Sequence, residues 1–214
     1  TQFVNAGTVS FGARWSISGS LQNETSMSVA GGQTLSATGG ITNLGNFTIS
    51  SGTIGSGGQV TNTVSGILTA HGTITPQVTN QGTLIVDGPL MAAITNTGIV
   101  QGAGTVTSPS NSFANNAGGV VNATTPGGAL AFTFAFSNNA GAVVNVGPTS
   151  TFSVGQTVSN SGQINLQGAG SRLSTGTLTN NGVIQGFGTI TSQLGTSSSG
   201  VFRASGGELD FTAT

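Results

Sequence analysis

Apolar and polar residues alternate in short runs along the whole chain, as in the segment Gly188-Thr189-Ile190-Thr191. A period of two residues is typical of a strand with one buried face. No window has the spacing of an amphipathic helix, and the chain contains 37 glycines, which disfavour helices. Asn and Gly separate the runs and offer the positive φ angles that sharp turns need. The pattern therefore predicts strand, Asn-Gly turn, strand and Gly-rich turn, repeated along the chain.

The most regular turn signal is the spacer Asn-x-Gly, and in eight of its nine occurrences an apolar residue follows the asparagine by four positions. Equivalent asparagines in stacked repeats lie above one another, so their amides can bond from one repeat to the next. Weaker versions of the spacer surround Asn23 and Asn62. We expect a ladder of amides at this corner, formed by Asn5, Asn43, Asn80, Asn96, Asn116, Asn139, Asn160 and Asn180.

An apolar residue just before each turn forms a second recurring position, which defines eleven units of about 19 residues. This residue precedes the turn asparagine by two positions in most units, and by three before Asn116 and Asn139. We expect it to form a buried column made of Phe3, Leu21, Ile41, Val60, Val78, Ile94, Phe113, Phe136, Val158, Leu178 and Leu194.

A single repeat of this length cannot bury its own apolar face, whereas stacked repeats share one continuous core. The sequence therefore predicts an all-β fold, a parallel β-solenoid of about eleven coils that occupies residues 1–214 as a single module. At about 4.8 Å per coil, such a stack is roughly 50 Å long.

When the last residues of the chain are placed before its first residues, the joined segment matches an internal repeat. Read from end to start, GGELDFTAT followed by TQFVNAGTVS parallels the internal segment GGALAFTFAFSNNAGAVV, so Thr1 follows Thr214 in pattern. This indicates either a piece of a longer tandem array or separate copies that stack end to end. Because an uncapped solenoid exposes backbone groups and core at its ends, we expect contacts between copies through Phe3, Val4, Leu209 and Phe211.

The charge content narrows the range of partners. Charged residues make up 3% of the chain, lysine is absent and the net charge is -1. Nucleic acids and anionic lipids are bound through many Lys and Arg contacts, so neither is an expected partner. No apolar run approaches the ~18 residues of a membrane helix, and no cysteine is present for disulfides or thiolate metal sites.

Few side chains in the sequence are of the types that catalyse reactions or bind metal ions. His71 is the sole histidine and has no evident partner in the sequence for a triad or a metal site, so it is interpreted as a turn residue, as is Asp87. Glu208 and Asp210 are spaced to share one strand face and are interpreted as solvated surface. Trp15 is interpreted as a loop or core anchor, with a sugar-stacking platform as the alternative. We expect no catalytic residues, no cofactor and no metal.

Thr-x-Thr pairs add one further possibility. They flank inward apolar residues and present two hydroxyls on one face, as ice-binding solenoids do. Gly, Ser and Pro interrupt them, which makes ice binding the less favoured hypothesis. The pairs are Thr73 and Thr75, Thr105 and Thr107, Thr177 and Thr179, and Thr189 and Thr191.

The units VTNQGTLIVDG, LTNNGVIQGFGTI and VSNSGQINLQGAG resemble the repeats of bacterial secreted β-helix proteins, such as filamentous-haemagglutinin and autotransporter passenger domains. The resemblance covers nearly the whole chain and implies a right-handed β-helix that is exported to the cell surface. It also implies a role in fibres, adhesion or extracellular matrix. The expected function is a structural module of an extracellular fibre or surface layer whose partner is a further copy of itself. The alternative is an adhesin that binds glycans or host surfaces.

Overall fold

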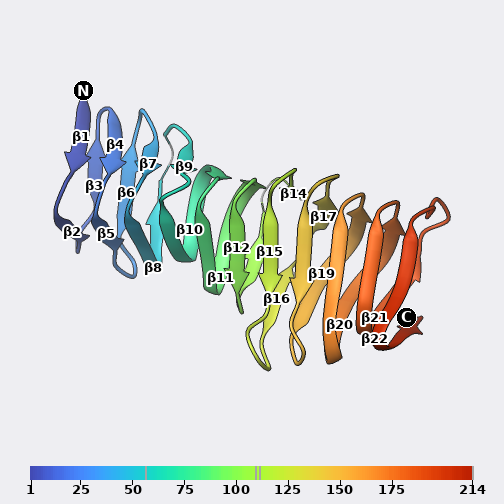
Figure 1. The fold of residues 1–214 in the computed structure, drawn as a ribbon. Coiled ribbons are helices and arrows are strands. Elements are labelled where there is room, and N and C mark those ends of the chain that lie inside the picture. The colour runs from blue at the N-terminus through green and yellow to red at the C-terminus, as the bar shows by residue number, and fades with distance from the viewer. Residues whose placement is uncertain (56, 109, 111, 214) are drawn as a thin grey trace.

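The computed structural model describes residues 1–55, 57–108, 110 and 112–213, and in these residues every regular element is a strand. The strands wind into a β-solenoid of about ten turns. Figure 1 shows the turns stacked into an elongated body with the two termini at opposite ends. The all-β solenoid prediction is confirmed, whereas Thr214 lies outside the described residues. The described part of the chain offers no helix with the length and hydrophobicity to span a bilayer.

Each turn contributes one strand segment to each of three sheets, and neighbouring turns pair in parallel. The first sheet holds the segments that end at the corner asparagines, the second sheet follows this corner, and the third sheet follows the Gly-rich corner. Parallel pairing arises because consecutive turns run in the same direction.

Some strands belong to one sheet and others bend through a corner into the next. The first sheet has β1 (Gln2–Asn5), β4 (Ser20–Asn23), β7 (Ile41–Asn43), β9 (Val60–Asn62), β14 (Ser112–Asn115) and β17 (Ala135–Asn138). The second has β2 (Thr8–Phe11), β5 (Ser26–Val29), β12 (Ile99–Gly102), β15 (Val120–Ala123) and β18 (Val143–Val146). The third has β3 (Trp15–Ile17), β6 (Thr34–Ala37), β13 (Thr105–Thr107) and β16 (Ala129–Phe132). The bent strands are β8 (Asn46–Ile54), β10 (Ile67–Asn80), β11 (Thr83–Asn96), β19 (Thr151–Asn160), β20 (Gln163–Asn180), β21 (Val183–Leu194) and β22 (Val201–Thr212).

Alternate residues of each strand point into the solenoid and form its core. The core is mostly Ile, Val and Leu, but a cluster of phenylalanines fills one region. Phe113 and Phe136 stack in parallel with ring centroids 5.1 Å apart, and Phe132 and Phe152 pack against Phe136 edge to face. Because each large ring removes much apolar area from water, this region contributes strongly to stability.

Nine of the eleven residues expected in the buried column are buried, and Phe3 and Leu194 are not. Both lie in the register of the column, since Phe3 pairs with Leu21 and Leu194 pairs with Leu178. They are 36% and 53% exposed because each belongs to an end turn of the described residues, so a neighbouring turn covers it on one side only. The sequence therefore predicts correctly that Phe3 and Leu194 lie in the column, but the prediction that they are buried is wrong.

Most glycines of the Asn-x-Gly corners have a different role from the expected one, whereas Gly118 and Gly141 do adopt positive φ. Gly82, Gly98 and Gly182 do not adopt positive φ, which occurs instead at glycines such as Gly72 and Gly186 at the Gly-rich corner. A methyl group at Gly98 would overlap the carbonyl oxygen of Gly82 in the preceding turn. At corners such as that of Gly98 the glycine is thus required for close stacking of one turn on the next, not for its φ angle.

Candidate assembly surfaces and flank sites

A continuous ladder of buried amides runs along the corner between the first and second sheets. In each step Nδ2 of one asparagine donates to Oδ1 of the asparagine in the next turn, at 2.7 to 2.9 Å. The same Nδ2 also donates to a backbone carbonyl of the next turn, as from Asn80 to Ile99 at 2.9 Å. The ladder consists of Asn5, Asn23, Asn43, Asn62, Asn80, Asn96, Asn115, Asn138, Asn160 and Asn180.

Six of the eight asparagines expected in the ladder belong to it, and Asn116 and Asn139 do not. In these two turns the preceding residues, Asn115 and Asn138, point inward. Asn116 and Asn139 instead form an exposed pair outside the corner, with Nδ2 of Asn139 2.7 Å from Oδ1 of Asn116. The inward position is set by the alternation of the strand, which places the ladder asparagine two residues after Phe113 or Phe136.

The first turn presents the ends of three apolar columns. Phe3 ends the column of the first sheet, Val9 ends that of the second, and Trp15 lies in register with the buried Leu35 of the third. Trp15 is 50% exposed and packs edge to face against Phe11, with ring centroids 5.5 Å apart. Trp15 is therefore part of the end surface, a role that its position in a single sequence does not reveal.

The last turn also presents the ends of three apolar columns. Leu194 ends the first-sheet column, Phe202 ends the second-sheet column through Ile184, and Phe211 ends a column of the third sheet through Ile190. Phe211 is 51% exposed, and its ring packs edge to face on Phe202 at 4.9 Å. The two end surfaces therefore share the columns of the first and second sheets. On the third sheet the register runs from Trp15 through Leu35, Ile54 and Ile74 to Ala92, and from Phe211 through Ile190, Leu173 and Phe152 to Leu130, so these two aromatic residues end different columns.

The remaining residues expected at the ends differ in position. Val4 lies in register with the outward Gln22, so its exposed side chain is on the flank and not in a core column. Leu209 pairs with Gly188 and packs partly against the core. The amide ladder stops at Asn180, whose N–H donates to Ser198 Oγ in the last turn at 3.1 Å. Contacts between copies would thus be apolar and backbone contacts and would not extend the ladder.

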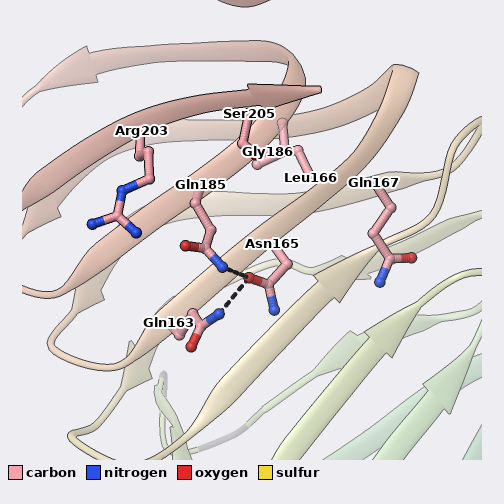
Figure 2. A pocket seen from close by; sticks show the side chains of 8 residues that line it. All are labelled: Gln163, Asn165, Leu166, Gln167, Gln185, Gly186, Arg203 and Ser205. Atoms are coloured by element: carbon pink, nitrogen blue, oxygen red, sulfur yellow. Dashed lines mark hydrogen bonds between the residues drawn. The ribbon is translucent and has the colours of Figure 1, made fainter. Parts of the chain in front are cut away.

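A polar hollow of about 390 Å³ lies on the outer face of the second sheet near the C-terminal end. Figure 2 shows the amides of Gln163 and Gln185 converging on Asn165, with Arg203 to one side and Gln167 to the other. Asn165 Oδ1 accepts from Gln163 Nε2 at 2.6 Å and from Gln185 Nε2 at 3.1 Å. Three strands, β20, β21 and β22, contribute these side chains. The sequence pattern gives no indication that these residues form a site.

His71 has a partner that the sequence did not indicate. Its Nδ1 lies 3.1 Å from Oδ1 of Asp87, which occupies the Gly-rich corner of the next turn. Ser51 and His71 both line another surface hollow, separate from the one around Asn165. No hydrogen bond joins these two side chains within the described residues. No group of three His, Cys, Asp or Glu side chains gathers anywhere in those residues. The pair therefore forms an exposed contact between turns.

We expect this contact to contribute little to stability. His71 and Asp87 are 30% and 45% exposed, and ion pairs at such positions contribute less than about 1 kcal/mol. Asp87→Asn should therefore change the free energy of unfolding by less than about 0.5 kcal/mol in thermal or urea unfolding. A loss of several kcal/mol would show that the pair holds the corner together.

The threonine pairs of the third sheet do not form a repeated array, although Thr42, Thr61, Thr79 and Thr95 lie in register on four successive turns of the first sheet. Thr105 aligns with Pro89 and Ala131 in the neighbouring turns, and Thr189 aligns with Arg172 and Asp210. The threonine pairs at these positions therefore do not continue from turn to turn as a flat hydroxyl face. Glu208 and Asp210 are both exposed on β22.

These surfaces are the candidate functional features of the described residues. No protein-family model, curated protein or solved structure matches this chain.

Proposed function

We propose that this chain is a structural module of an extracellular bacterial fibre, matrix or surface layer, assembled through the ends of its solenoid. The observation that carries the proposal is the match between the two end surfaces. Leu194 and Phe202 at one end occupy the same columns as Phe3 and Val9 at the other, and each end also exposes an aromatic side chain on the third sheet, Trp15 or Phe211. A turn placed on either end would continue the core, whether it belongs to the same polypeptide or to a second copy.

Head-to-tail stacking follows from the direction of the chain. Parallel pairing between turns continues only if the last turn of one module meets the first turn of the next. Such a contact is heterologous and does not close, so it generates a filament rather than a dimer. The net charge of -1 gives little repulsion between modules. The resemblance to secreted β-helix proteins supports the extracellular setting.

The expected affinity is modest. Covering six partly exposed apolar side chains contributes on the order of 6 kcal/mol. Loss of translational and rotational freedom costs roughly 4–15 kcal/mol, so backbone hydrogen bonds between the end strands are also needed. Stacking should therefore depend strongly on protein concentration.

Gly7 offers a direct test, because it is the corner glycine of the first turn and no atom lies within 4 Å of a methyl group placed on it. At five equivalent interior corners the same methyl would overlap a carbonyl oxygen of the preceding turn, namely those of Gly45, Gly82, Gly98, Gly162 and Gly182. Gly7→Ala should therefore leave the fold intact and weaken stacking by at least about tenfold, measured by sedimentation velocity over a concentration series.

The matched control is Ala6→Ser, which alters the variable middle position of the same corner. It should stack like the unmodified chain. Equal association of all three proteins would contradict stacking through the first turn, as would their remaining monomeric at the highest concentration.

A further inference from the structure

The polar hollow around Asn165 has features of a binding site that the assembly of the fibre does not require. All eight lining residues come from one chain, so the hollow does not depend on end-to-end stacking. We propose that it binds an acidic saccharide, with the carboxylate of a hexuronic acid on Arg203 and sugar hydroxyls on the glutamine amides.

Arg203 supplies the charge. Its side chain is exposed, and within the described residues it makes no ion pair or hydrogen bond with another residue. No carboxylate lines the hollow, so its local charge is positive although the whole chain carries -1. A guanidinium binds a carboxylate with two parallel hydrogen bonds. One cation suits a ligand with single, spaced negative charges better than a nucleic acid or a polyphosphate.

The amides supply oriented acceptors. Asn165 uses Nδ2 to donate to Asn145 Oδ1 at 2.8 Å, while its Oδ1 accepts from both Gln163 and Gln185. These bonds fix the two glutamine amides through their Nε2 atoms. Within the described residues no hydrogen bond engages Oε1 of either glutamine, so two acceptors are held in place for hydroxyl donors.

The shape favours a linear ligand. A second hollow of about 370 Å³ shares Gln163 with the first and extends across the corner over Gly162 and Gly182, where no side chains intrude. The lining of the first hollow has no exposed aromatic ring and only the buried Leu166 as a large apolar residue, so it offers no pocket for apolar side chains of a peptide. The second hollow adds only the half-buried Val143 and Val183. An extended saccharide with hydroxyls on both faces fits this surface.

The test uses tetragalacturonate as the probe, with its fully methyl-esterified form as the neutral control. Titration calorimetry or ligand-observed NMR should show binding of the acid form, and esterification should weaken it by about five- to tenfold. Arg203→Gln should weaken binding of the acid form by the same factor. Arg172→Gln removes an equally exposed arginine from the third sheet and should leave binding unchanged.

A second variant separates a saccharide site from a bare anion site. Gln185→Leu should weaken binding of tetragalacturonate while Arg203 remains, and sodium acetate at the same carboxylate concentration should not displace the saccharide. The inference is overturned if the acid form does not bind at millimolar concentration, or if the ester binds equally well. It is also overturned if acetate competes on equal terms, or if both arginine variants have the same effect.

Discussion

Asn138→Ala is expected to lower the free energy of unfolding by about 3 kcal/mol or more. Asn138 Oδ1 accepts from Asn115 at 2.9 Å, and its Nδ2 donates to Asn160 Oδ1 at 2.8 Å and to the carbonyl of Gln163 at 3.1 Å. The substitution removes these bonds and leaves Asn160 Oδ1 buried without its donor. An unsatisfied buried polar group costs about 1–3 kcal/mol, and several are created at once.

The neighbouring residue provides the control for this prediction. Asn139 is exposed and, among the described residues, its side chain bonds only to Asn116, so Asn139→Ala should cost less than about 1 kcal/mol. Urea unfolding followed by circular dichroism measures both variants under identical conditions. Equal losses at the two adjacent positions would show that the buried ladder is not a main source of stability.

Gly98→Ala is expected to destabilise the solenoid by about 3 kcal/mol, although alanine normally favours ordered structure over glycine. The added methyl would overlap the carbonyl oxygen of Gly82 and the backbone of Gln81 in the preceding turn. Since the obstacle is backbone and not a flexible side chain, the two turns must separate to relieve it. Thermal unfolding should show a lower midpoint than that of the unmodified chain. Hydrogen exchange should be faster than in the unmodified chain in β11 and β12, and unchanged in the distant β2.

Gly7→Ala is the matched control for Gly98→Ala, since it changes the same motif position in the turn that has no preceding turn. It should leave the unfolding midpoint unchanged or slightly raised, because alanine restricts the unfolded chain. If Gly98→Ala were equally harmless, close backbone stacking would not be the reason for glycine at these corners.

The solenoid could be predicted from the sequence because two local rules repeat in every turn. Strand alternation fixes which residues point inward, and Asn-x-Gly fixes where the chain turns. The error at Asn116 and Asn139 arose because two adjacent asparagines compete for the corner, and the spacer selects the wrong one. The distance from the inward Phe113 and Phe136 carried the correct signal, since the ladder asparagine lies two residues after the inward residue.

The contacts between turns could not be predicted in the same way. Successive ladder asparagines are separated by 16 to 23 residues, so a small error in register moves every outward neighbour. The pairing of His71 with Asp87, and the approach of Arg203 to Gln185, both depend on this register. The exposure of Phe3, Trp15 and Leu194 depends on which turns are terminal. A repeat pattern assigns these residues to a column but does not say whether another turn covers them.

Electron microscopy of the purified chain across a concentration series tests end-to-end stacking most directly. Stacking predicts unbranched rods that are multiples of roughly 50 Å in length, with the spacing of about 4.8 Å between turns continuing across each junction. Gly7→Ala should shift the population to single modules at the same concentration. Dispersed particles of roughly 50 Å at every concentration of the unmodified chain would contradict assembly through the solenoid ends.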